Sequence, residues 1–261
     1  MLIDHTDRVV IVSGAGRGIG REIALRFAAE GARVVALDLA FDEADGGAPD
    51  SISRVVCDVT DEESVRSAVA GVEATHGRID VLVNNAGINV VGAVDELTAA
   101  QWRRCMDVNT TGVLLLSQAV IPAMRRQRWG RILNAASFAA IVPSVGSAAY
   151  AASKAAVVAF TRVLAGELGP WDVTVNAYAP GMVPTAMNGF ADMPPERQSA
   201  LLDTLTLRRW ERAEDVADLL VFLASDAAGY ITGTLVDVSG GKLATQIPSR
   251  AYEGFGDEVA R

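Results

Sequence analysis

A glycine-rich turn joins a short apolar run to a helical pattern near the start of the chain. Residues 8–13 are mostly β-branched, and residues 18–30 carry apolar side chains at helical spacing. Between them Gly14, Gly18 and Gly20 stand in a G-x-x-x-G-x-G spacing. Glycines at such a turn permit a tight bend and a close approach of other groups to the backbone. The pattern therefore predicts a strand–turn–helix unit with an open backbone cradle at the turn.

Strand-like runs alternate with helical patterns along the rest of the chain. Further strands are predicted at residues 33–37, 55–57, 80–84, 130–136, 173–178 and 235–238, and helices at 61–75, 98–124, 147–168 and 213–223. This alternation is typical of an α/β fold, here a doubly wound, mainly parallel seven-stranded sheet with helices on both faces. Neither a repeat nor a linker divides the chain. We therefore expect one domain over residues 1–246, with a substrate lid at about 182–207, and a C-terminal tail at 247–261.

A glycine turn that opens a helix favours phosphate groups, because free backbone N–H groups and the helix dipole face the ligand. With a strand before it and a helix after it, we interpret the turn as a dinucleotide-binding loop. Asp38 lies eighteen residues beyond Gly20, at the end of the second predicted strand. A carboxylate there can accept both hydroxyls of an adenosine ribose and would repel a 2′-phosphate, which favours NAD over NADP. Arg17 is the counterargument, since an arginine in the turn could meet a phosphate.

Tyr150 and Lys154 lie four residues apart in a run of small residues, so a helix would place them on one face. A phenol with a pKa of about 10 is a poor acid or base at neutral pH, and a neighbouring cation lowers that pKa. The chain has 23 basic residues, of which only Lys154 and Lys242 are lysine. A lysine at position 154 indicates a need for a compact charge. Because Ser137 lies thirteen residues before the tyrosine, we expect these three side chains to act together.

Composition narrows the possible functions. Half of the chain is hydrophobic, 21% is charged and the net charge is −9, which argues against general disorder and against a basic nucleic-acid-binding or membrane-binding face. No uninterrupted apolar run approaches the about 18 residues of a membrane span, and the charged amino terminus is unlike a signal peptide. Cys57 and Cys105 lack metal-ligand spacing, and His5 and His76 are too scattered for a metal site. We therefore expect a cytoplasmic protein with reduced, buried thiols and without a metal.

The order of the motifs resembles the short-chain dehydrogenase/reductase family in its single-domain form. Besides the glycine turn and the tyrosine–lysine pair, the resemblance rests on Asp58, Asn84-Asn85-Ala86-Gly87, Asn109, Ser137 and Pro180-Gly181. It covers nearly the whole chain and implies a Rossmann fold that binds a nicotinamide cofactor. Two positions depart from the family pattern. Ser13 replaces the usual threonine, and Ala136 replaces the first serine of a Ser-Ser pair whose second member is Ser137.

The resemblance also assigns roles to particular residues. Asp58 and Val59 would contact the adenine, and residues 180–185 would hold the nicotinamide carboxamide. Tyr150 would be the general acid/base, Ser137 would hold the substrate oxygen, and Asn109 would position a water next to Lys154. The full predicted cofactor-binding set is Gly14, Arg17, Gly18, Ile19, Gly20, Asp38, Asp58, Val59, Asn85, Ala86, Gly87, Tyr150, Lys154, Pro180, Gly181, Val183 and Thr185.

We expect a secondary alcohol or ketone as the substrate. Apolar residues of the predicted lid and of the segment opposite it favour a neutral, mainly apolar or small polyhydroxy molecule; they are Met187, Phe190, Met193, Leu201, Ile141, Val142 and Val145. A first alternative is a reductase of 3-oxoacyl groups on an acidic carrier protein, which would need a basic docking patch. The candidate patch is Arg125, Arg126, Arg128 and Arg131. A second alternative, a nucleotide-sensing regulator, would leave the Ser137, Tyr150 and Lys154 group without a use.

The resemblance further implies a homotetramer, formed through the helices that bear Asn109 and Tyr150. Alanines along the second helix permit close packing of another helix, although they could equally pack on the chain's own sheet. We also expect the tail, with Tyr252 and Phe255, to fold over a neighbouring site.

Overall fold

The computed structural model describes residues 3–41, 49–185 and 188–254. Seven parallel strands form one sheet in the order β3-β2-β1-β4-β5-β6-β7. The strands are β1 (Val9–Ser13), β2 (Arg33–Asp38), β3 (Ile52–Val56), β4 (Val81–Asn84), β5 (Gly130–Ala135), β6 (Val173–Pro180) and β7 (Leu235–Val238). The α-helices are α1 (Gly18–Ala29), α2 (Glu62–His76), α3 (Ala99–Met106), α4 (Gly112–Gln127), α5 (Ala148–Leu168), α6 (Pro195–Leu202), α7 (Ala213–Ala224) and α8 (Arg250–Gly254).

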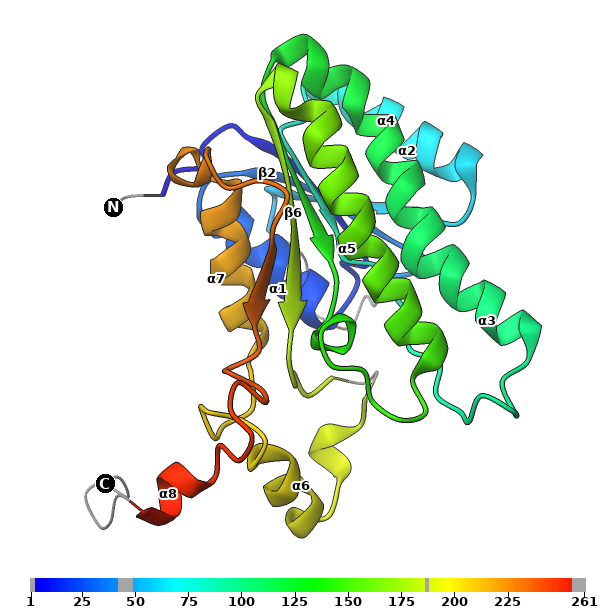
Figure 1. Cartoon of the computed structure of the whole chain (residues 1–261). Coiled ribbons are helices and arrows are strands. Elements are labelled where there is room, and N and C mark those ends of the chain that lie inside the picture. Colours follow the sequence, from blue (N-terminus) through cyan, green and yellow to red (C-terminus); the bar gives the residue numbers. More distant parts are fainter. Residues whose placement is uncertain (1–2, 42–48, 186–187, 255–261) are drawn as a thin grey trace.

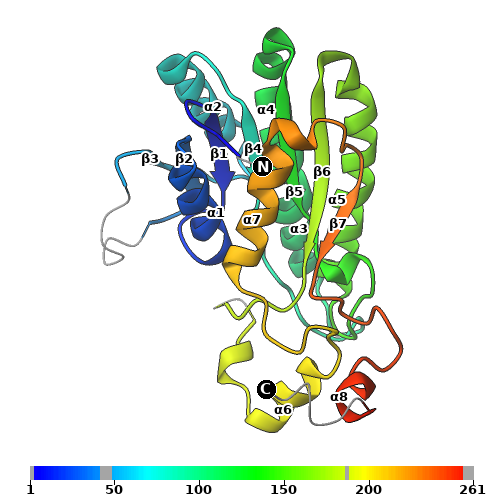
Figure 2. The same cartoon turned by 90° about the vertical axis from the view of Figure 1, so that its left-hand side faces the viewer.

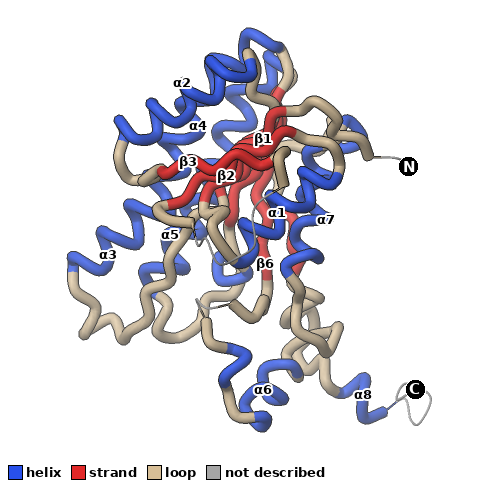
Figure 3. The backbone as a smooth tube through the Cα atoms, turned by 180° about the vertical axis from the view of Figure 1, so that it is seen from behind, coloured by secondary structure: helices blue, strands red, loops and turns tan. Residues whose placement is uncertain are grey.

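Helices cover both faces of the sheet. Figures 1 and 3 show α1 and α7 on one face and α2, α4 and α5 on the other. Each face has its own buried apolar cluster, one centred on residues such as Ile11, Leu82 and Ile132 and the other on Val10, Phe27 and Leu220. The predicted α/β doubly wound class is therefore confirmed, and the sheet is parallel throughout rather than mainly parallel.

The sequence explains the positions of the main elements. Every residue of β1, β4 and β5 is buried, as expected for parallel strands covered on both faces. Asp61 caps α2 by accepting the backbone N–H groups of Glu63 and Ser64, and Gly77 ends this helix with φ of 70°. Thr98 and Gln101 form a capping box at the start of α3. These local signals agree with the tertiary structure, so the elements form where their patterns predict.

Two elements differ from the predictions by more than one or two terminal residues. The helix predicted from 98 to 124 is divided, because a π-helical turn, η2 (Asp107–Thr111), separates α3 from α4. The third strand begins at Ile52 rather than at residue 55, so it extends into the connection between the second and third predicted strands. This strand lies at the sheet edge and is largely exposed, so its polar residues hide the alternation expected of a strand. Residues 42–48 of the same connection lie outside the described residues.

Helix α5 is the longest helix of the described chain. By length and composition alone, Ala148–Trp171 could cross a membrane, with a mean hydropathy of 1.2. In the fold this helix packs against β5, β6 and α3, and Ala149, Val157 and Leu164 on it are buried. Its apolar character is therefore that of a core helix of an α/β sheet, raised by the many alanines that let it lie close to the strands.

The predicted lid and tail lie beyond the carboxyl ends of the strands. Figure 2 shows α6 and α8 there, below the sheet in that view. A short 3₁₀ element, η5 (Phe190–Asp192), precedes α6, and the ring of Phe190 stacks on Trp210 at 5.5 Å. The Tyr252 hydroxyl donates to the carbonyl of Thr206 and accepts from the N–H of Arg208, so the described part of the tail contacts its own chain. Met187 and Phe255, named in our predictions, lie outside the described residues.

Gly20 provides a test of the tight packing at the start of α1. A Cβ at this position would overlap the carbonyl oxygen of Gly14 and lie 2.5 Å from Nδ2 of Asn85. We expect Gly20→Ala to lower the free energy of unfolding by about 3 kcal/mol or more, because backbone must move to make room. The control is Gly71→Ala in α2, where a Cβ would meet nothing within 4 Å. This change should raise the free energy of unfolding by about 0.5–1 kcal/mol. Urea unfolding measures both, and equal effects would contradict the packing argument.

Candidate active site

The glycine turn lies between β1 and α1, at the carboxyl edge of the sheet. Gly14 and Gly18 have φ of 65° and 57°, a conformation that side chains with a Cβ rarely adopt. Arg17 is the N-cap residue of α1, and its side chain makes no capping hydrogen bond. The N–H groups at the start of α1 are therefore free of side-chain caps, which suits them to an anion. Arg17 itself is exposed, while Ile19 is half-buried.

Asp38 lies beside the glycine turn, at the end of β2. Its carboxylate accepts the N–H of Gly16 at 2.8 Å and the N–H of Leu39 at 2.7 Å. A Cβ at Gly16 would lie 2.9 Å from Oδ2 of Asp38 and 2.6 Å from the carbonyl oxygen of Ala40. Gly16 therefore brings the turn against the carboxylate, a role that our sequence analysis missed. The signal was present, because glycine occupies every second position from Gly14 to Gly20.

Ser13 connects the glycine turn to the segment after β4. Its hydroxyl accepts the backbone N–H groups of Asn85 and Ala86 at 3.1 and 3.2 Å. In the other direction, the amide of Asn85 donates to the carbonyl oxygens of Ser13 and Gly14. A serine therefore supplies the hydroxyl expected of threonine, and the departure from the family pattern leaves these contacts intact. Asn85 and Ala86 lie directly against Gly14, where a Cβ would be 2.7 Å from Cα of Ala86.

Asn109 lies fully buried in the π-helical turn η2. Its side chain accepts the N–H of Ile88 at 2.8 Å, and it donates to the carbonyl of Ile88 and to the hydroxyl of Ser153, both at 2.9 Å. These bonds tie the segment after β4 to α5. A Cβ at Gly87 would lie 3.3 Å from Oδ1 of Asn109 and 3.4 Å from Nζ of Lys154. Gly87 therefore lets Asn109 and Lys154 approach the same point, and π turns of this kind are frequent at functional sites.

Ser137, Tyr150 and Lys154 meet at the carboxyl ends of β5 and β6. The hydroxyl of Ser137 accepts the N–H of Ala139 at 3.1 Å and lies within hydrogen-bonding reach of the Tyr150 phenol. Nζ of Lys154 lies 5.7 Å from the centre of the Tyr150 ring and donates to the carbonyl of Ala135 at 2.8 Å. Lys154 is buried and Tyr150 is half-buried. The helical spacing thus correctly placed the phenol and the ammonium on one face of α5.

Electrostatics at this group differ from the sequence-based expectation. Burial raises the pKa of the Tyr150 phenol above its usual value, and the hydrogen bond with Ser137 acts in the opposite direction. Burial also lowers the pKa of Lys154 to about 8, because the interior disfavours its charged form. We expected the ammonium to lower the pKa of the phenol. In the protein alone, burial has the larger effect on both groups.

The other predicted cofactor residues surround the same edge. Asp58 follows β3, where its carboxylate accepts the N–H and the hydroxyl of Thr60, and Val59 is buried next to it. Across the edge, the methyl group of Thr185 lies 3.9 Å from the position of a Cβ at Gly18. The segment after β6 thus approaches the glycine turn from the opposite side.

Asn188 stabilises the segment after β6, a role absent from our predictions. It donates to the carbonyl of Val183 at 2.7 Å and accepts the N–H of Thr185 at 3.2 Å. Its side chain therefore fixes the backbone of two residues that we expect to hold the cofactor. An asparagine that bonds nearby backbone groups is a common turn signal, and it could have been found from the sequence.

These features fit a nicotinamide dinucleotide. The turn is a backbone cradle that Cβ atoms would fill, the start of α1 offers uncapped N–H groups for a pyrophosphate, and Asp38 offers a carboxylate for a ribose. The phenol, the hydroxyl and the ammonium of Tyr150, Ser137 and Lys154 lie at the same edge of the sheet, where open α/β sheets bind ligands.

Neither buried thiol is suited to catalysis. Burial raises the pKa of Cys57 and of Cys105, so both remain protonated at neutral pH. The structure also separates the predicted basic patch from the site. Arg131 is the second residue of β5, at the end opposite to the edge that carries Tyr150, and it is buried beside Trp129.

Comparison with known proteins agrees with this site. A family profile described as enoyl-(acyl carrier protein) reductase matches residues 14–242. The chain is 37% identical over 240 residues to the 3-oxoacyl-[acyl-carrier-protein] reductase FabG of Thermotoga maritima. This match covers 90% of this chain and 97% of the relative. It is 35% identical over 242 residues to the human dehydrogenase/reductase SDR family member 4, with 90% and 87% covered. The crystal structure of levodione reductase matches with a TM-score of 0.86 at 34% identity, covering 92% of this chain and 99% of that chain.

The family profile spans most of the chain, and these relatives match it over nearly their whole length. Membership implies a nicotinamide dinucleotide, NAD or NADP, and oxidoreductase chemistry at a CH–OH group of a small molecule. The chain belongs to the short-chain dehydrogenase/reductase family.

Proposed function

We propose that the protein is an NAD-dependent oxidoreductase that interconverts a secondary alcohol and a ketone, with Tyr150 as the general acid/base. The observation that carries the proposal is the meeting of Ser137, Tyr150 and Lys154 at the sheet edge that also holds the glycine turn. A nucleotide-sensing regulator would have no use for this group, so the regulator is the weaker reading.

The chemistry follows from the positions of these side chains. A nicotinamide bound at this edge supplies the electron chemistry, by exchanging hydride with the carbon that bears the substrate oxygen. Tyr150 takes the hydroxyl proton during oxidation and returns it during reduction. Ser137 holds the substrate oxygen by a hydrogen bond, and the charge of Lys154 favours the phenolate form of Tyr150. Asn109 fixes the segment around Gly87 against Lys154. We also propose that Asn109 positions a water next to that lysine.

Asp38 supports NAD rather than NADP as the cofactor. Its carboxylate is fixed by the N–H groups of Gly16 and Leu39, so its charge stays next to the glycine turn. A 2′-phosphate at that position would be repelled, whereas ribose hydroxyls can donate to the carboxylate. Arg17 is exposed and forms no capping bond, and it does not neutralise Asp38 in the protein.

Apolar side chains around the site support a neutral, mainly apolar substrate. Ile141, Val142 and Val145 are exposed on the segment that follows Ser137, and Val145 is fully exposed. Large apolar side chains held in water next to a catalytic group favour a substrate that covers them. Phe190, also expected to line the lid, instead stacks on Trp210 and anchors the lid.

The second candidate function is reduction of a 3-oxoacyl group on a carrier protein, because the Thermotoga maritima relative is named for that activity. An acidic carrier needs exposed basic groups near the site. The predicted patch instead lies away from the site: Arg131 is buried near the amino end of β5, and the exposed Arg125, Arg126 and Arg128 lie at the end of α4, which precedes it. We therefore rank a small alcohol or ketone ahead of a carrier-bound substrate.

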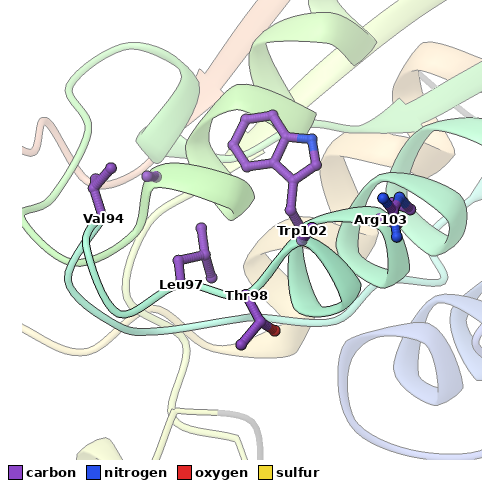
Figure 4. Close-up of a pocket in the computed structure, with 7 residues that line it drawn as sticks. Val94, Leu97, Thr98, Trp102 and Arg103 are labelled. Carbon is purple, nitrogen blue, oxygen red and sulfur yellow. The ribbon is translucent and has the colours of Figure 1, made fainter.

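We further propose a cytoplasmic homotetramer assembled through α3, α4 and α5. Trp102, Leu114 and Val163 are exposed on these three helices. An open pocket of about 470 Å³ lies between the start of α3 and the start of α5, and Trp102, Val94 and Leu97 are among the residues that line it (Figure 4). A second copy packed on these helices would remove this apolar surface from water.

Tyr150→Phe tests the assignment of the proton donor. Without the hydroxyl, we expect kcat to fall by at least about 10²-fold while the dissociation constant for NADH changes little. Tyr230→Phe is the matched control, because Tyr230 is fully exposed. It should retain the activity of the wild type. A screen of secondary alcohols and ketones gives the rates, and fluorescence titration gives NADH binding. Near-normal turnover in Tyr150→Phe would overturn the assignment.

Asp38→Asn tests the choice of cofactor. The substitution removes the charge but retains a side-chain oxygen, so we expect the ratio of kcat/KM for NAD to that for NADP to fall about tenfold. Asp50→Asn is the control, since it removes an exposed carboxylate just before β3. Parallel rate measurements with both cofactors decide the matter. A preference for NADP in the wild type would refute the proposed cofactor.

A further inference from the structure

Glu211 is a buried carboxyl group just before α7, outside the catalytic group. Only 7% of the residue is exposed. Its Oε2 accepts the N–H of Gly181 at 2.6 Å, and its own backbone N–H donates to the carbonyl of Met182 at 3.2 Å. Glu211 therefore holds two consecutive residues at the start of the predicted lid. These residues directly precede Val183, which we expect to hold the nicotinamide carboxamide.

The contact lies at the base of the lid, where both ends of the lid meet. Gly181 is pressed against the chain after β7, because a Cβ there would lie 2.8 Å from Cα of Ser239. At the other end of the lid, the N–H of Leu207 donates to the carbonyl of Gly240 at 2.9 Å. These segments and the start of α7 line a cavity of about 310 Å³, to which Glu211 contributes. A change at Glu211 is therefore expected to affect both ends of the lid.

Few interactions in this position would stabilise a negative charge on the Glu211 carboxyl group. Its Oε1 is buried and has no hydrogen-bond partner among the residues that the structure describes. Asp215 on α7 and Asp237 on β7 repel a negative charge there, and Asp218 also lines the cavity. Arg209 is the attractive group, but its guanidinium is bound to both oxygens of Asp215, at 2.7 and 3.1 Å.

The protonation of Glu211 follows from these surroundings. Burial raises its pKa to about 8, and Asp215 and Asp237 add to the rise, while the N–H of Gly181 and the charge of Arg209 oppose it. The carboxyl group is thus neutral at pH 7 in the described arrangement. If the lid base opened to water, the pKa would return towards its usual value of 4.5. Ionisation therefore favours the opened arrangement.

We propose that Glu211 is a positioning residue: its neutral carboxyl group anchors residues 180–185 and the lid base, and its ionisation at alkaline pH releases them. The part that concerns the cofactor rests on the proposed function. Glutamate is needed for the release, because glutamine would provide an acceptor for Gly181 but could not ionise.

Stability of the protein without cofactor tests the anchor directly. The wild type binds more protons folded than unfolded between about pH 4.5 and 8, so this group's contribution to stability is lost as pH rises through that range. Glu211→Gln removes this loss. The Tm of Glu211→Gln minus that of the wild type should therefore increase from pH 5 to pH 8 and level off above pH 9. Lys154 has the opposite pH dependence above pH 8, but it is common to both proteins and cancels.

Binding of NADH tests the link to the cofactor segment. If closure of the segment shifts the pKa of Glu211 by one unit, the dissociation constant of the wild type should rise about tenfold from pH 7 to pH 9.5 beyond any rise in Glu211→Gln. Glu214→Gln, an exposed carboxylate in the first turn of α7, is the control and should follow the wild type. In turnover measurements, the additional pH dependence of the wild type should appear in the KM for the cofactor rather than in kcat.

Parallel Tm profiles of the wild type and Glu211→Gln would overturn the anchor. Equal pH dependence of NADH binding, with Tm profiles that diverge, would overturn its effect on the cofactor segment. An absence of NADH binding at every pH would instead refute the proposed function. Should Glu211→Gln fail to fold, hydrogen exchange of the wild type decides: protection of residues 181–185, corrected for intrinsic rates, should fall above pH 8, and constant protection would reject the proposal.

Discussion

The hydrogen bonds between Ser13 and Asn85 hold together the two segments on which the candidate site depends. β1 lies between β2 and β4, so the connections that leave β1 and β4 diverge there to opposite sides of the sheet. Two N–H groups after β4 bind the hydroxyl of Ser13, and the Asn85 amide binds two carbonyls at the end of β1. This contact holds the glycine turn beside the segment that leads to Gly87. The cofactor cradle and the catalytic group therefore share one rigid edge.

Local patterns predicted most of the fold and the principal side chains of the site. Buried parallel strands appear as continuous apolar runs, and the spacing of Tyr150 and Lys154 needs only one helical turn. The errors occur where a neighbour distant in sequence decides the outcome. Gly16 is set by its approach to Asp38, and the π turn at Asn109 coincides with bonds to Ile88 and Ser153. A single sequence does not state which segments will meet, so the π turn could not be predicted from spacing, whereas the repeated glycines from Gly14 to Gly20 did signal a role for Gly16.

Glu211 is the clearest example of this limit. In the sequence it is one of several charged residues before α7, and an exposed helix start would be its expected environment. The fold instead closes the lid base over it, and its neighbours Glu214 and Arg212 remain exposed. Helical periodicity does not distinguish these positions because all three precede or begin the helix. Burial here results from contacts with Gly181 and Met182, which follow β6 and lie far away along the chain.

Burial disfavours the charged form of both Lys154 and Glu211, so it lowers the pKa of the lysine and raises that of the glutamate, each to about 8. Below that pH the sheet edge contains a buried ammonium and a neutral carboxyl group. Above it, the amine is neutral and the carboxyl group is ionised. Over this narrow interval the positive charge beside Tyr150 is lost and a negative charge appears beside Gly181. Loss of the ammonium removes its support for the phenolate of Tyr150, and in our proposal ionisation of Glu211 releases residues 180–185. Both effects oppose the proposed reaction at alkaline pH, so the fold couples its pH dependence to two groups that are distinct from its proton donor.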